Sequence, residues 1–222
     1  MIETVIFDFN GTLYFDKDLN EQSWKIIYKE IIGNDDNFTN ELETILSKKD
    51  DTNIKEFFDR AGKIVDEETI DMFALKKETL YQELAKSQNR NKLADGAYEL
   101  LEYLNQNNIK MVLASASIKY NVDFYLNYCG LNKWFDYSSI AYDDGINKNK
   151  KEIYLKAIEL SKTNIENILA FDDSSGSINS GIEAGIKKII RINPHGYKKV
   201  DSPYILEELI DFKNLDYSIF KK

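Results

Sequence analysis

The segment at residues 5–13, VIFDFNGTL, constrains the fold of this chain more than any other segment. Its apolar residues predict a buried strand that ends at Asp8, and Gly11 permits a sharp turn directly afterwards. Ligands of open α/β sheets bind at the carboxyl ends of the strands. A carboxylate in this place is suited to nucleophilic attack on phosphorus. The alternative is a buried strand whose aspartate only caps the turn.

Composition limits the partners and the compartment. The chain has 222 residues, with 38 acidic and 29 basic side chains and a net charge of -9. This balance argues against nucleic acid as a partner, because phosphate backbones require a basic surface. An acidic protein that binds a phosphorylated anion needs a local positive site or a metal. The single cysteine, Cys129, excludes an internal disulfide and favours a reducing, cytoplasmic location.

No segment of the sequence resembles a signal peptide or an apolar run of membrane-spanning length, so we expect no membrane partner. The length is sufficient for one large domain with a smaller inserted one. A monomer is favoured over an oligomer.

Two different patterns divide the chain. Residues 18–88 carry apolar side chains at helical spacing, such as Trp24, Ile27 and Ile31, and predict an inserted helical domain. Residues 1–17 and 89–222 alternate between apolar runs and amphipathic stretches, which predicts a Rossmann-like α/β domain with a mostly parallel sheet covered by helices on both faces. After the first strand we expect strands near 109–114, 137–141, 168–171 and 187–192, and helices near 98–104, 119–128, 150–160 and 178–184.

Polar groups of complementary kinds follow three of the expected strands. The first strand offers Asp8, the second offers Ser115 and Ser117, and a later one offers Asp172 and Asp173. Lysines at 148, 150 and 151 lie between the second and the last of these. Parallel strands place their carboxyl ends at one edge of a sheet, so we expect these groups to converge.

The converging groups predict a phosphoryl-transfer site. Three carboxylates crowd negative charge and need a cation, and hard oxygen ligands suit Mg²⁺. A serine hydroxyl with the backbone amide after it, and a lysine ammonium, would bind the remaining phosphoryl oxygens. Each group also has an ordinary structural explanation: Ser115 as a helix cap, Asp172 and Asp173 as a helix-entry pair, and the lysines as a solvated face.

Four short motifs in this order resemble those of the haloacid dehalogenase (HAD) superfamily. They are residues 8–13, residues 113–117, Lys148 with residues 152–154, and residues 170–174. The second motif has the form of the β-phosphoglucomutase-like branch, and the helical block has the place and size of the C1 cap of that branch. The resemblance implies a Mg²⁺-dependent phosphatase that acts on a small phosphorylated metabolite, such as a sugar phosphate, through an aspartyl-phosphate intermediate.

The resemblance also implies a role for individual residues. Asp8 would be the nucleophile. The metal ligands would be Asp8, the backbone carbonyl of Asn10, Asp173 and, directly or through water, Asp172. The phosphoryl and substrate contacts would come from Thr12, Ser115, the amide of Ala116, Ser117 and Lys148, and Lys77 would contact the substrate from the cap. The alternative for Lys77 is an exposed helix lysine.

One departure from the family pattern bears on catalysis. Asn10 stands where the family has a second aspartate, the general acid and base, and an amide cannot exchange that proton. Loss of such a group costs ~10²–10⁴-fold in rate. The resemblance therefore leaves three functions open: a phosphatase of impaired activity, a β-phosphoglucomutase-like sugar phosphomutase, and a catalytically weak phosphate-binding or regulatory protein.

Overall fold

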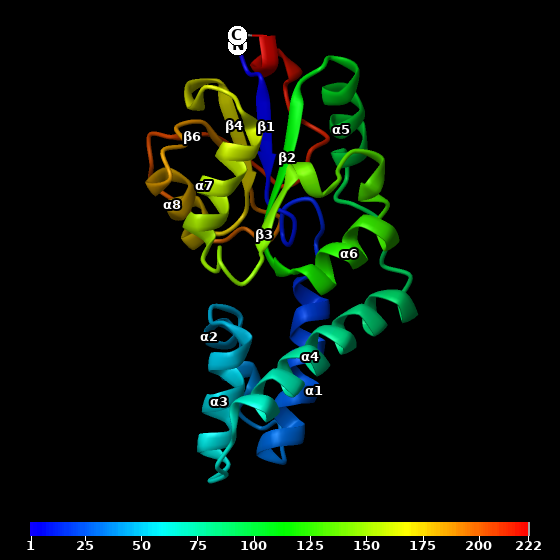
Figure 1. The fold of residues 1–222 in the computed structure, drawn as a ribbon, viewed down its shortest axis with the longest axis vertical. Coiled ribbons are helices and arrows are strands. Elements are labelled where there is room, and N and C mark those ends of the chain that lie inside the picture. Colours follow the sequence, from blue (N-terminus) through cyan, green and yellow to red (C-terminus); the bar gives the residue numbers. More distant parts are fainter. Residues whose placement is uncertain (222) are drawn as a thin grey trace. The chain divides into compact units, whose positions relative to one another are not determined.

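A six-stranded parallel sheet organises residues 1–15 and 92–222, which form one of the two units of this computed structural model (Figure 1). The structure describes residues 1–221. The strand order is β3-β2-β1-β4-β5-β6, and every paired neighbour is parallel. The strands are β1 (Thr4–Phe7), β2 (Lys110–Ile118), β3 (Ile140–Asp143), β4 (Ile168–Asp172), β5 (Ile189–Ile192) and β6 (Ile205–Leu209).

Helices cover both faces of this sheet, as the sequence predicts. The helices α5 (Ala97–Gln106) and α6 (Lys119–Tyr128) lie on one side, and α7 (Lys150–Ser161) and α8 (Ser175–Glu183) lie on the other (Figure 1). The strand order accounts for this division, because the chain moves outward from β1 to β3 and then returns to β4 on the other side of β1. Crossovers between parallel strands are almost always right-handed, so a reversal of direction moves the connecting helices to the opposite face. Fully buried residues of β1, such as Ile6, pack beneath α7 and α8 in the core. The α/β fold expected from the sequence is confirmed.

The observed strands differ from the predicted ones chiefly in the start of β3, the length of β2 and the presence of β6. Residues Tyr137–Ser139 form a 3-10 turn instead of the start of a strand, because the side chain of Asp136 caps the backbone there. The strand β2 continues through Ser115 and Ser117 to Ile118. The edge strand β6 was not predicted, since its central residues are exposed and carry no apolar run.

The second unit, residues 16–91, is a bundle of four helices. Its helices are α1 (Lys17–Ile32), α2 (Phe38–Leu46), α3 (Asp50–Arg60) and α4 (Glu67–Ser87). They enclose an aromatic core in which Trp24 and Tyr28 pack edge-to-face on Phe57. The side chain of Asp66 accepts a hydrogen bond from the Thr69 amide and caps the start of α4.

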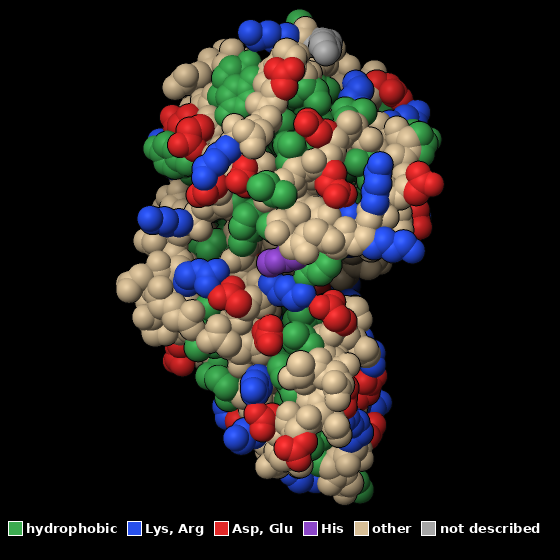
Figure 2. Space-filling view, turned by 180° about the vertical axis from the view of Figure 1, so that it is seen from behind, with side chains coloured by type: hydrophobic (Ala, Val, Ile, Leu, Met, Phe, Trp, Pro, Cys, Tyr) green, Lys and Arg blue, Asp and Glu red, His purple; other side chains and the backbone are tan. Residues whose placement is uncertain are grey.

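The surface of the described residues is mixed in charge. On the face shown in Figure 2, Lys and Arg side chains are interspersed with Asp and Glu side chains over both units. The described residues also include exposed ion pairs, such as Lys76 with Glu30. Across residues 1–221, no helix combines the length and the apolar character required to traverse a lipid bilayer.

Candidate active site

Asp8 is delivered to the edge of the sheet by β1. The four residues of this strand are fully buried between β2 and β4, and the Asp8 amide continues the pairing by donating to the Phe171 carbonyl at 2.9 Å. The chain then turns, and the Thr12 and Tyr14 amides donate to the carbonyl of Phe9. The apolar strand thus ends in one carboxylate that is held by a hydrogen-bonded loop.

Two features of that loop require a glycine at position 11. Its φ of +80° is a left-handed conformation that other L residues rarely adopt. A Cβ atom at this position would also lie 2.5 Å from Oδ2 of Asp173, which is far inside van der Waals contact. The glycine therefore allows the loop after β1 to approach the acidic loop after β4.

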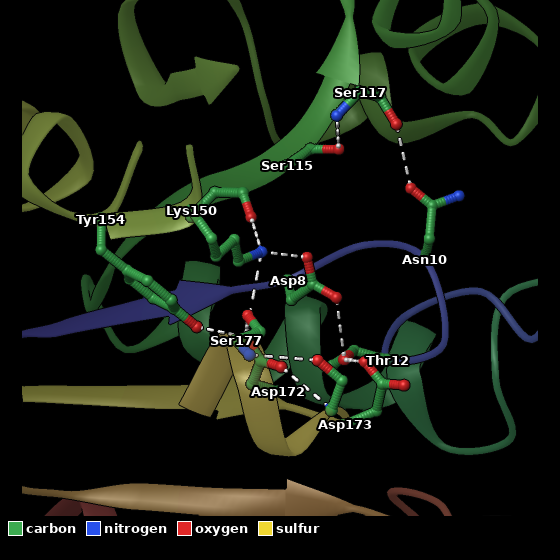
Figure 3. A network of polar contacts seen from close by, with 12 residues as sticks. Asp8, Asn10, Thr12, Ser115, Ser117, Lys150, Tyr154, Asp172, Asp173 and Ser177 are labelled. Carbon is green, nitrogen blue, oxygen red and sulfur yellow. Dashed lines mark hydrogen bonds and ion pairs between the residues drawn. The ribbon is translucent and has the colours of Figure 1, made fainter. Parts of the chain in front are cut away.

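The two oxygens of Asp8 have different partners (Figure 3). The Lys150 ammonium forms an ion pair with Oδ1, and the Thr12 hydroxyl donates to Oδ2 at 3.3 Å. The same ammonium donates to the carbonyl of Ala114 at 2.7 Å, and the Thr12 hydroxyl lies 3.5 Å from Oδ1 of Asp173. These contacts fix the orientation of the Asp8 carboxylate.

The structure brings Lys150 to Asp8, whereas the resemblance assigned the phosphoryl-binding lysine to Lys148. The reason is the capping box at the start of α7. The Asn149 side chain accepts a hydrogen bond from the Glu152 amide, and the Glu152 side chain accepts hydrogen bonds from the amides of Lys148 and Asn149. Lys150 is the first helical residue, and its side chain reaches Asp8 and the Ala114 carbonyl within β2. Lys148 precedes the cap and is exposed.

Asp8, Asp172 and Asp173 form an acidic cluster in which one carboxylate oxygen from each residue lies within 4.8 Å of the others. Three hard oxygen donors at this spacing suit Mg²⁺, and the tight packing of Asp173 against Gly11 fixes one of them. The residues present therefore fit the metal that the resemblance implies. The role of the Asn10 carbonyl as a further ligand stays a prediction.

Asp172 is completely buried and is surrounded by donors. Both Tyr154 and Ser177 donate their hydroxyls to Oδ2, and the Ser174 amide donates to Oδ1 at 3.2 Å. Burial and the negative charge of Asp172 raise the pKa of Tyr154 well above its ordinary value, which keeps the phenol protonated as a donor. These hydrogen bonds therefore fix the orientation of the Asp172 carboxylate within the acidic cluster.

The crowding of charge also affects Asp8 and Lys150. Burial raises the pKa of Asp8 to about 6, Asp172 adds to this effect, and Lys150 opposes it. Burial disfavours the charged form of Lys150, but the neighbouring carboxylates outweigh this effect and raise its pKa. The lysine is therefore a permanent cation, and the carboxylate of Asp8 is stabilised further by any additional cation.

The serines of β2 lie beside this cluster. Ser115 is fully buried, and its hydroxyl accepts the Ser117 amide at 3.2 Å. The hydroxyl of Ser117 donates to Oδ1 of Asn10 at 3.1 Å. Ala116, between the two serines, is exposed. The structure thus brings Asp8, Thr12 and Ser115 to one edge of the sheet, with Ser117 linked to Asn10.

The Asn10 amide extends toward Ser117 in Figure 3. It also donates from Nδ2 to the Tyr125 hydroxyl at 3.0 Å, and Tyr125 and Ser117 are themselves 3.1 Å apart. The ring of Tyr125 packs on Phe9 with 4.1 Å between the centroids. Two hydroxyl groups, both able to donate or accept, therefore surround the side chain at position 10.

Lys77, the predicted substrate contact, belongs to the helical unit and is not the exposed lysine of the alternative explanation. Only 5% of the Lys77 surface is exposed. Its ammonium contacts Oδ1 of Asn20 at 3.1 Å and Oε1 of Glu78 at 3.0 Å. Asp50 lies 3.7 Å away, and the ammonium lies over the ring of Trp24. Contact with a substrate stays a prediction.

Sequence reasoning missed Tyr154, Ser177 and Tyr125 as partners of the site residues. A signal existed for the first of these, because Lys150 and Tyr154 are four residues apart and share one face of α7. The ammonium of Lys150 lies 5.2 Å from the ring centroid of Tyr154. Ser177 lies five residues after Asp172, in the first turn of α8, and was not predicted as its partner. Tyr125 meets Asn10 only through packing, which no local pattern reveals.

Comparison with known proteins agrees with this geometry. The family model of the haloacid dehalogenase-like hydrolases matches residues 2–185. A HAD hydrolase of family IA, variant 3, from Entamoeba histolytica is 28% identical with a TM-score of 0.84, and the match covers 99% of this chain and 97% of that one. A β-phosphoglucomutase from Clostridium difficile is 24% identical with a TM-score of 0.78, covering 100% and 96%.

A third similar structure is CbbY from Rhodobacter sphaeroides in complex with phosphate, which is 20% identical with a TM-score of 0.79 and 96% coverage of both chains. The last two structures support the fold, and the family model supports membership over most of the chain. The chain therefore belongs to the haloacid dehalogenase-like hydrolases, and its fold is that of the β-phosphoglucomutase-like members.

Proposed function

We propose that this chain is a Mg²⁺-dependent phosphatase of a small phosphorylated metabolite, with Asp8 as the nucleophile. The observation that carries the proposal is the arrangement around Asp8, whose carboxylate is oriented by Lys150 and Thr12 inside a cluster with Asp172 and Asp173. A carboxylate that is fixed in this way beside a permanent cation is suited to attack a phosphorus atom.

The proposed reaction has two steps. One oxygen of Asp8 attacks the phosphorus of the ester, the bond from phosphorus to the leaving oxygen breaks, and the leaving alkoxide takes a proton from water, because Asn10 cannot supply one. Water then attacks the phosphorus of the aspartyl phosphate, which releases phosphate and restores Asp8. Lys150 and the hydroxyl and amide groups at Ser115 and Ala116 stabilise the negative charge on the transferring group.

Asp8, Asp172 and Asp173 would hold the Mg²⁺ ion, with the carbonyl of Asn10 as a further ligand. When bound, the ion supplies charge neutralisation for the phosphoryl oxygens. Asp173 reaches this position because Gly11 has no side chain, and Thr12 links Asp173 to Asp8. The helical unit, residues 16–91, is assigned the role of a cap that selects the substrate, with Lys77 as its polar contact.

The substrate class is proposed to be sugar phosphates. Similar structures include a β-phosphoglucomutase and a CbbY variant that carries an asparagine in place of an aspartate and was crystallised with xylulose 1,5-bisphosphate. A HAD phosphatase from Thermococcus onnurineus is also similar, with a TM-score of 0.67. The similarity to these proteins supports hydrolysis or transfer of the phosphoryl group of a sugar phosphate.

The test is a screen of phosphate monoesters, including sugar 1-phosphates and 6-phosphates, with excess substrate and with Mg²⁺ or a chelator. We expect slow Mg²⁺-dependent phosphate release over many turnovers. Isomerisation of a sugar 1-phosphate to the 6-phosphate would instead show a mutase. Less than one turnover with every ester, for the natural chain and for its Asn10→Asp variant, contradicts both.

A second candidate function is a phosphate-binding or regulatory protein, and Asn10 favours it. The amide is engaged by Ser117 and Tyr125 and cannot accept a proton from water. The same two hydroxyls can both donate to a carboxylate, so the pocket accommodates Asn10→Asp. We expect this substitution to raise phosphate release ~10²–10⁴-fold if only the acid and base is missing. An unchanged low rate, with phosphate still bound, favours the binding protein.

A further inference from the structure

Arg191 is a buried cation next to the acidic cluster. It lies on β5, and the parallel register of the sheet places it opposite Asp172 of β4. Only 1% of the residue is exposed, so its guanidinium must find its hydrogen-bond partners inside the protein. It lies outside residues 2–185, the part of the chain that the family model matches.

The guanidinium reaches the residue that follows β4. Its Nε–H donates to the backbone carbonyl of Asp173 at 2.9 Å. The Asp173 amide and carbonyl lie just beyond the described bounds of β4, where the strand ladder ends. The hydrogen bond from Arg191 therefore holds the peptide of Asp173 at the point where strand pairing no longer does.

The far end of the guanidinium is itself anchored. Its Nη1 donates to the Lys198 carbonyl at 2.9 Å and to Oε2 of Glu208 at 3.1 Å. The second oxygen of Glu208 accepts from Asn193 at 3.0 Å, and Asn193 also donates to the Tyr197 carbonyl. Arg191 thus connects the Asp173 peptide to a braced segment at the edge of the sheet, and its side chain has little freedom to move.

We propose that Arg191 is a positioning residue that sets the Mg²⁺ affinity of the site through its Nε–H bond to Asp173. The carboxylate of Asp173 lies so close to Gly11 that a single Cβ atom there would collide with it, and the Thr12 hydroxyl contacts Oδ1. A small rotation of the Asp173 peptide would carry its carboxylate out of the cluster with Asp8 and Asp172. This inference rests on the proposed function, since it assigns the acidic cluster to a metal.

Two substitutions separate the hydrogen bond from the charge. In Arg191→Gln the amide nitrogen occupies the position of Nε, so a donor to Asp173 is kept while the charge is lost. In Arg191→Lys a methylene occupies that position, so the charge is kept while the donor is lost. Arg60→Lys is a matched control, because Arg60 belongs to the helical unit and pairs there with Glu41.

The measurement is the Mg²⁺ dissociation constant by isothermal titration calorimetry without substrate, well below the unfolding temperature of each variant. Positioning groups behind a metal ligand typically change affinity ~10–100-fold. We expect Arg191→Lys to weaken Mg²⁺ binding by a factor in this range, and Arg191→Gln and Arg60→Lys to change it less than about threefold. Activity of Arg191→Lys at saturating Mg²⁺ should recover.

Three outcomes overturn the inference. The first is equal Mg²⁺ affinity of Arg191→Lys and the natural chain. The second is weaker binding by Arg191→Gln than by Arg191→Lys, which assigns the effect to charge. The third is a failure of both variants to fold, by circular dichroism, which makes Arg191 a purely structural residue. Absence of Mg²⁺ binding by the natural chain contradicts the proposed function instead.

Discussion

Each of the two units buries a lysine among carboxylates, but the two clusters are built differently. Lys150 takes its partners from two neighbouring strands, through Asp8 just after β1 and the Ala114 carbonyl within β2. Lys77 takes its partners from helices, and one of them, Glu78, is its own neighbour in the sequence. A parallel sheet edge gathers distant residues, whereas a helical bundle pairs groups that are near in the chain or on adjacent helices.

The clusters also relieve their negative charge in different ways. Within residues 1–221, the only set of three carboxylates with oxygens within 4.8 Å of one another is Asp8, Asp172 and Asp173. In the helical unit, burial raises the pKa of Asp50 to about 7, and a hydrogen bond with Glu78 contributes. A divalent cation suits the first cluster, and a shared proton suits the second.

The largest expected effect comes from removing one carboxylate from each unit. Asp8→Asn should abolish phosphate release, a loss on the order of 10³-fold or more, because the amide is not a nucleophile. Asp50→Asn makes the same chemical change in the helical unit and should alter kcat less than about tenfold, because no bond forms at this side chain. Equal losses in a phosphate-release assay would remove the distinction between the two clusters.

The next effect separates two neighbouring lysines. Lys150→Ala should lower kcat/KM by about 10²–10³-fold, because it removes a charged donor from Asp8 and from the transferring group. Lys148→Ala should lower it less than about threefold, since this exposed side chain precedes the cap of α7. A greater loss in Lys148→Ala would restore the assignment that the sequence suggests.

A glycine in each unit tests how tightly the acidic cluster is packed. Gly11 and Gly33 both have positive φ, but a Cβ atom would collide with Asp173 only at Gly11 and would meet nothing within 4 Å at Gly33. Both alanine variants should lose about 1–2 kcal/mol of stability from backbone strain. Only Gly11→Ala should also weaken Mg²⁺ binding, by about tenfold or more. Calorimetry on both variants checks this, and unchanged binding in Gly11→Ala contradicts the packing argument.

Much of this comparison was predictable from the sequence. The buried strands, the helical insertion and the convergence of Asp8, Ser115, Asp172 and Asp173 follow from periodicity and from the geometry of parallel sheets. The fold prediction succeeded because the strands are apolar runs with polar ends. The edge strand β6 was not predicted, because its exposed central residues do not form an apolar run.

The failures at the site have a common physical cause. The choice between Lys148 and Lys150 depends on which residue begins α7, and one capping box decides it. Tyr125 and Arg191 reach their partners across the fold, at sequence separations that no periodic pattern connects. Ser177 lies five residues after Asp172 and meets it across the loop that leads from β4 into α8. Helix starts and tertiary hydrogen bonds therefore limit what the sequence alone provides.

The smallest expected effect is the dependence of stability on pH. Burial raises the pKa of Asp8 to about 6 and that of Asp50 to about 7, both above the ordinary value of 3.8. The folded chain then binds more protons than the unfolded chain between these values, so the free energy of unfolding should fall as the pH rises from 4 to 7. Thermal unfolding between pH 4.5 and 8 measures this change.

Mg²⁺ and Asp50→Asn should separate the two contributions. Mg²⁺ stabilises the ionised form of Asp8, so it should remove the part of the slope that Asp8 contributes between pH 3.8 and about 6. The part from Asp50, which extends to about pH 7, should remain. Asp50→Asn should remove the other part, worth roughly 1–2 kcal/mol. This value is below what the full pKa shift implies, because the Asp50 side chain is 30% exposed. If Mg²⁺ flattened the whole slope, both carboxylates would belong to one metal-linked cluster, and the contrast between the units would fail.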